Sequence, residues 1–66
     1  MEHSLLAYIE RQSTNALQGF LWQVMQQNTW GSYANVVPEI FRSIQERGDA
    51  IAPQLLEAWN AWQKNQ

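Results

Sequence analysis

The stretch from Ala16 to Trp30, ALQGFLWQVMQQNTW, is the densest apolar segment of the chain and decides its fold. When successive residues are placed 100° apart, as in an α-helix, its apolar side chains gather on one face. Apolar and polar residues do not alternate in this stretch, which argues against a β-strand. The same face continues towards the N-terminus, so an arc about 120° wide holds Leu6, Ile9, Leu17, Phe20, Leu21 and Val24.

The extent of this helix depends on the polar triplet Ser13-Thr14-Asn15. These residue types compete with the helical backbone for hydrogen bonds and prefer helix ends, so two helices meeting here are one interpretation. The apolar arc nevertheless keeps its phase across the triplet, and a break normally resets the phase. We therefore predict one long helix over residues 3–29, bent at the triplet.

The rest of the chain predicts a turn and two shorter helices. Gly31 and Gly48 can adopt a positive φ after a helix. Pro38 and Pro53 each fall in a first helical turn, where the missing N–H costs little. These signals place a turn at residues 30–35 and helices at residues 36–47 and 50–63.

The prediction is an all-α fold, a single domain over residues 1–66 with three helices. A first helix over residues 3–29 spans about 40 Å at the standard rise, more than two short helices can cover. A domain this small buries only about 60% of its unfolded surface, and it has no cysteine to form disulfides. Pairing of two long helices about a two-fold axis would bury the part of the first helix that the short helices leave uncovered. We therefore expect a homodimeric helical bundle.

Aromatic residues off the apolar arc mark the predicted contact surface. Tyr8, Gly19 and Trp22 lie on the opposite side of the first helix, where Gly19 would allow another backbone to approach closely. The alternative is that the third helix covers Trp22 and makes it part of the core. The same two interpretations, core or contact, apply to Trp59 and Trp62. Trp30 either plugs the end of the helical hairpin or belongs to a loop that faces a ligand. We predict that the residues that contact a partner or a second copy are Tyr8, Gly19, Trp22, Trp30, Trp59 and Trp62.

Composition argues against several functional classes. The net charge is −2, with one lysine and three arginines, and no basic stripe suits a nucleic acid. The lone histidine, His3, has only Glu10 at a helical spacing, and no cluster of ligating residues suits a metal. The three glycines are isolated and form no phosphate-binding loop. We expect no enzymatic activity, no catalytic residues, no metal and no cofactor.

Targeting signals are also missing from the sequence. The N-terminus MEHS has no basic region, and glutamines interrupt the only apolar stretch. We expect a cytoplasmic protein that contacts no membrane and functions as a protein–protein interaction module, an adaptor, inhibitor or assembly factor. The alternatives are a binder of a small molecule or pigment in a Trp-lined pocket and, less favoured, a DNA-associated regulator.

Overall fold

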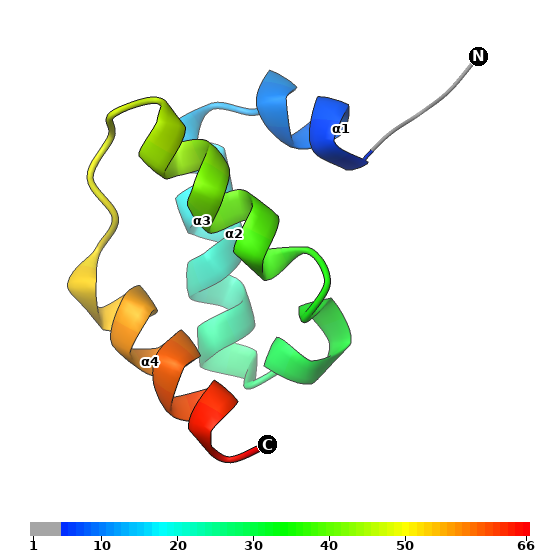
Figure 1. The fold of residues 1–66 in the computed structure, drawn as a ribbon, viewed down its shortest axis with the longest axis vertical. Coiled ribbons are helices and arrows are strands. Elements are labelled where there is room, and N and C mark those ends of the chain that lie inside the picture. The colour runs from blue at the N-terminus through cyan, green and yellow to red at the C-terminus, as the bar shows by residue number, and fades with distance from the viewer. Residues whose placement is uncertain (1–4) are drawn as a thin grey trace.

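The structure, a computed structural model, describes residues 5–66. Within this range the chain forms four α-helices and a short 3-10 helix, with no β-strand. The all-α prediction is confirmed, whereas the predicted number of three helices is wrong. The elements are α1 (Leu5–Arg11), α2 (Thr14–Gln27), η1 (Trp30–Tyr33), α3 (Val37–Glu46) and α4 (Pro53–Lys64) (Figure 1).

The predicted long helix is broken at Ser13 into α1 and α2. Ser13 has an extended backbone (φ −71°, ψ 157°) and is the N-cap of α2, where its Oγ accepts a hydrogen bond of 3.1 Å from the N–H of Ala16. The N–H of Gln12 bonds the carbonyl of Ile9 and closes α1. The helix therefore breaks at the Ser13 cap although the apolar pattern continues across it. Leu6, which was predicted in the core arc, is 44% exposed. Residues 3 and 4 of the predicted helix lie outside the described range.

Two residues with positive φ end α2 and α3. Asn28 (φ 54°) follows α2, and Gly48 (φ 76°) follows α3. After each, the next N–H bonds a carbonyl five residues back, Thr29 to Val24 and Asp49 to Ile44, the pattern of a Schellman motif. The positive φ that was predicted at Gly31 is thus found at Asn28. Most of the predicted turn at residues 30–35 is the 3-10 helix η1.

Prolines fix the starts of the last two helices. Each lies at the first or second position of its helix, Pro38 in α3 and Pro53 in α4. The helix α3 lies within the predicted range 36–47, and α4 begins at Pro53, three residues later than predicted. Its late start leaves residues 49–52 as a connecting loop.

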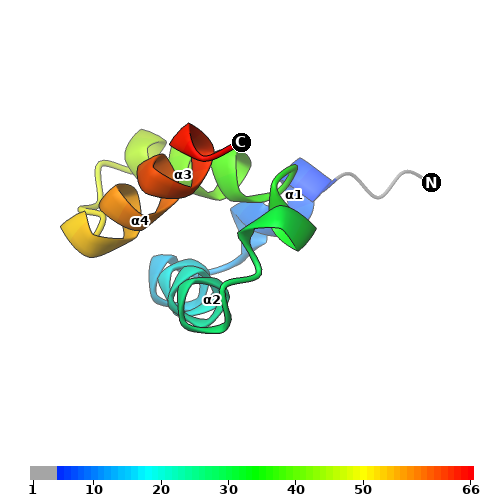
Figure 2. The same ribbon diagram turned by 90° about the horizontal axis from the view of Figure 1, so that it is seen from below.

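The helices form two layers around one apolar core. Figure 2 shows α2 on one side of the molecule, and α3 with α4 on the other. Side chains from all the helices meet between these layers, while α1 packs at one end against α3. The buried apolar residues are Ile9, Leu17, Leu21, Val24, Trp30, Val37, Ile40, Phe41, Ile44, Leu55 and Trp59.

Aromatic rings occupy the end of the core formed by η1 and α4. Trp59 lies 5.4 Å from Trp30 and 6.4 Å from Phe41, measured between ring centroids. Trp62 stacks on Trp59 at 5.4 Å with an interplanar angle of 14°. One tryptophan of α4 therefore joins three other rings, which makes it the centre of this part of the core.

The break at Ser13 also removes the reason given for a dimer. That expectation rested on a first helix about 40 Å long, whereas α2 has 14 residues and α1 has seven. Any case for self-association now depends on apolar residues that the fold leaves exposed: Leu5, Leu6, Tyr8 and Tyr33.

Candidate functional site: an apolar groove between α1 and α2

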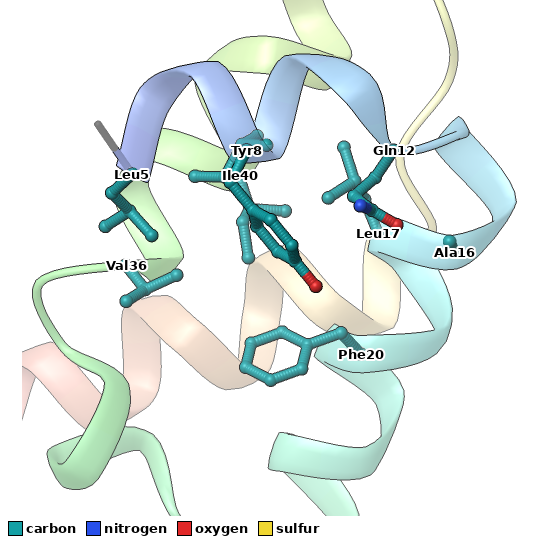
Figure 3. A pocket seen from close by; sticks show the side chains of 9 residues that line it. Leu5, Tyr8, Gln12, Ala16, Leu17, Phe20, Val36 and Ile40 are labelled. Atoms are coloured by element: carbon teal, nitrogen blue, oxygen red, sulfur yellow. The ribbon is translucent and has the colours of Figure 1, made fainter. Parts of the chain in front are cut away.

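An open groove of about 150 Å³ lies between α1 and α2 and reaches down to α3. Tyr8 from α1 and Phe20 from α2 point toward one another across it (Figure 3). The edge of the Phe20 ring also packs on Tyr33, at 5.1 Å between centroids. The residues that line the groove are Leu5, Tyr8, Ile9, Gln12, Ala16, Leu17, Phe20, Val36 and Ile40.

One face of α1 forms a wall of the groove. Leu5, Tyr8, Ile9 and Gln12 follow helical i, i+3, i+4, i+7 spacing, so they share a side of α1. Ile9 is buried, whereas Leu5 is 45% and Tyr8 63% exposed. The wall is therefore anchored at its middle and leaves apolar and aromatic area open to a second molecule.

Arg47, at the end of α3, holds α1 in place. Its Nη2 donates hydrogen bonds to the carbonyls of Ile9 (3.1 Å) and Glu10 (3.3 Å), and its Nη1 donates to Thr14 Oγ1 at 3.3 Å. The last carbonyls of a helix have no intrahelical partner, and a cation there also suits the helix dipole. One guanidinium thus joins the end of α1, the start of α2 and the end of α3.

The loop before α4 is attached to the same region of α2. Thr14 Oγ1 donates to the carboxylate of Asp49. The Gln18 side chain donates to the carbonyl of Ala50 at 2.9 Å and accepts from the N–H of Ala52 at 3.3 Å. These bonds hold the first turns of α2 against the loop that follows α3.

The lining of the groove is uncharged at neutral pH. Among the described residues that line it, Gln12 and Tyr8 carry the polar side chains, and none has a carboxylate, ammonium or guanidinium group. A charged group that entered would lose its hydration without meeting a counterion, which is unfavourable. The geometry therefore suits an apolar group.

The predicted contact residues fall into separate places. Tyr8 lines the groove, and Gly19 lies on α2, where a Cβ added to it would meet no neighbouring side chain of residues 5–66 within 4 Å. Trp22 is partly buried against the core. Trp30 and Trp59 are 3% and 7% exposed, so little of either ring is left for a partner to touch. Trp62 is partly buried and stacks on Trp59.

Most groove residues were absent from the predicted contact set. Leu5, Ala16 and Phe20 face the groove only because the chain changes direction at Ser13. On a continuous helix, Phe20 belonged to the core arc and Tyr8 to the far side. The signal that could have found the groove was the helix-capping preference of Ser13.

Chemistry that depends on clustered ionisable groups has little support in this structure. Among residues 5–66, no group of three or more His, Cys, Asp or Glu residues could hold a metal ion. The pairing of His3 with Glu10 considered from the sequence involves a residue outside the described range.

None of the helices formed by residues 5–66 combines the length and the apolar character needed to cross a bilayer.

Comparison with known proteins gives no family for this chain. No protein-family model matches it, and neither the curated proteins nor the solved structures show a significant match.

Proposed function

We propose that this protein is a small, non-enzymatic protein–protein interaction module whose binding surface is the groove between α1 and α2. The observation that carries the proposal is an open, uncharged, apolar groove bordered by the exposed side chains Leu5 and Tyr8. Apolar area of this kind, concentrated beside a hollow, is typical of sites where another protein docks. Tyr8 was predicted from the sequence as a contact residue, and the groove supports that choice.

The size of the groove favours a side chain over a free ligand. Its volume of about 150 Å³ suits a single ring or branched aliphatic group. Sites for drug-sized molecules enclose about 300–1,000 Å³. The groove is smaller than such sites and no tryptophan is among the described residues that line it, so it gives no support to a Trp-lined pocket for a pigment. An amphipathic segment of a partner that inserts one apolar side chain fits best.

A second copy of the chain is one protein that could supply such a side chain. Leu5 and Tyr8 are both exposed on α1 and line the groove, so an isologous contact through the groove would bury them together. Light scattering over a range of concentrations tests this form of the proposal. A mass near twice 7.7 kDa supports self-association, and a constant mass of 7.7 kDa contradicts it.

Two neighbouring leucines give a matched test of the groove. Leu5 and Leu6 are 45% and 44% exposed, but only Leu5 lines the groove. Peptides selected from a random display library on the wild-type protein serve as the probe. Leu5→Gln should weaken their binding about fivefold, since burial of about half a leucine is worth about 1 kcal/mol. Leu6→Gln, the control, should leave Kd within about twofold. Equal effects of the two substitutions, or none, would refute the groove as the binding site.

A further inference from the structure

The connection between α1 and α2 is short, and a weak local interaction stabilises its bend. Gln12 and Ser13 alone separate the end of α1 at Arg11 from the start of α2 at Thr14. The N–H of Ala16 donates to Ser13 Oγ at 3.1 Å, in a bond that is exposed to solvent. Loss of a serine cap typically shifts a helix equilibrium by a factor of about five. A single substitution at position 13 therefore removes the cap that favours the bend.

The apolar pattern, in contrast, suits a helix that continues through this connection. Leu6, Leu17 and Val24 would lie in line on such a helix, because their separations are close to whole numbers of turns. In the bent form Leu17 and Val24 are buried, whereas Leu6 is 44% exposed. The first N–H groups of a helix have no carbonyl partner within it, and a continuous helix would offer those of α2 the carbonyls of α1. A straight backbone at Ser13 would satisfy both the pattern and these N–H groups.

The contacts of α1 keep a single chain bent. Figure 1 shows α1 lying at an angle to α2, and α1 packs against α3. Ile9 is 2% exposed and belongs to the common core. Arg47, at the end of α3, donates to the carbonyls of Ile9 and Glu10. We call the face of α3 under α1, together with the Arg47 guanidinium, the α1 seat. A chain that straightened alone would lose the seat's contacts.

We propose that two copies of the protein exchange α1, so that each chain straightens at Ser13 and places its α1 on the seat of the other. Such domain swapping retains the contacts of α1 with α3 and Arg47, and makes them between chains. Short connections favour this exchange. The groove keeps its lining, with the wall formed by α1 supplied by the second copy. This inference goes beyond the proposed function and does not depend on it.

Ser13→Ala and Ser13→Gly are the matched pair that tests the exchange. Both remove the hydroxyl, but glycine is still an adequate cap and is unfavourable inside a helix, whereas alanine is a poor cap and the best helix former. Two chains straighten in each dimer, so the preference counts twice. Equilibrium sedimentation should therefore give Ser13→Ala a dimer dissociation constant at least about tenfold lower than that of Ser13→Gly.

The residues that meet between chains distinguish exchange from a dimer that forms through the groove. Labelled and unlabelled Ser13→Ala chains are unfolded and refolded together, and isotope-filtered NOEs are recorded on the dimer. Exchange predicts NOEs between Ile9 of one chain and α3 of the other. A dimer of bent chains cannot give them, because Ile9 is then buried against its own α3. The ¹³Cα shifts of residues 12–14 should also become helical.

Each other outcome contradicts the exchange. Equal dissociation constants for Ser13→Ala and Ser13→Gly would overturn it, as would a Ser13→Ala dimer in which the NOEs of Ile9 stay within one chain. A Ser13→Ala chain that is unfolded at every concentration would also overturn it, since pairing with a second copy should restore the fold. None of these results bears on the proposed function, which the comparison of Leu5→Gln with Leu6→Gln tests separately.

Discussion

Replacement of Trp59 by alanine is expected to lower the free energy of unfolding by about 3–5 kcal/mol. The Trp59 side chain is 7% exposed and contacts the rings of Trp30, Phe41 and Trp62. A domain of 66 residues has about 3–10 kcal/mol of stability in total. The variant should therefore lose a large fraction of its stability, which a urea titration followed by far-UV circular dichroism can measure.

Trp59→Phe is the matched variant for this prediction. It keeps an aromatic ring among the other three and should cost less than half as much as alanine. The sequence also allowed Trp59 to be an anchor for a partner. A Trp59→Ala protein that stays within about 1 kcal/mol of the wild type and loses only a binding partner would establish that function instead of the core position.

Replacement of Arg47 by methionine should weaken the attachment of α1 to the rest of the protein. Methionine keeps the aliphatic stem but loses the hydrogen bonds to Ile9, Glu10 and Thr14. Hydrogen bonds from a charged donor are worth about 1.5–3 kcal/mol when buried, and these are only partly buried, so we expect a loss of about 1–2 kcal/mol. Hydrogen exchange should accelerate most at the amides of α1 and the first turn of α2.

Arg42 supplies the control for Arg47. It lies on α3 with a 58% exposed side chain, and its 3.0 Å bond to Glu39 is an ordinary surface ion pair. Arg42→Met should change stability by no more than about 0.5 kcal/mol. If Arg47→Met changed the free energy of unfolding as little as Arg42→Met does, the Arg47 guanidinium could not be what holds α1 in place beside the groove.

The parts of the fold that local chemistry dictates were predictable from the sequence. Gly48 marks the end of α3 because it suits a positive φ, and Pro53 lies in the first turn of α4 as predicted, although the helix begins at Pro53 and not at residue 50. The apolar stripe of α3, with Val37, Ile40 and Ile44, is buried as its spacing indicates.

The break at Ser13 was harder to predict, because two signals disagreed there. The apolar phase persists across Ser13 since Ile9 of α1 and Leu17 of α2 enter the same core. A shared core therefore preserves the pattern even where the backbone does not continue as a helix. The groove depends on this break and on the long-range bonds from Arg47 to α1, which no local pattern reveals.

The sequence also could not tell which tryptophans lie in the core and which contact a partner, for a reason unrelated to the break at Ser13. Aromatic residues on helices serve both purposes with the same spacing, so Trp22 and Trp59 look alike in the sequence. Only the packing of α4 and η1 around Trp59 distinguishes it. The contact functions predicted for Gly19, Trp22 and Trp62 stay predictions, whereas Tyr8 now has a groove beside it.

The most direct test of the binding surface is a toluene titration of the ¹⁵N-labelled protein followed by NMR. Enclosed apolar cavities of about 150 Å³ in other proteins bind benzene. The groove is open to solvent but has a similar volume and an apolar lining, so we expect a small aromatic ring to enter it. The account predicts saturable chemical-shift changes confined to residues 5–20 and 36–40. Changes centred on Trp30, Trp59 and Trp62, or no saturable change at all, would contradict it.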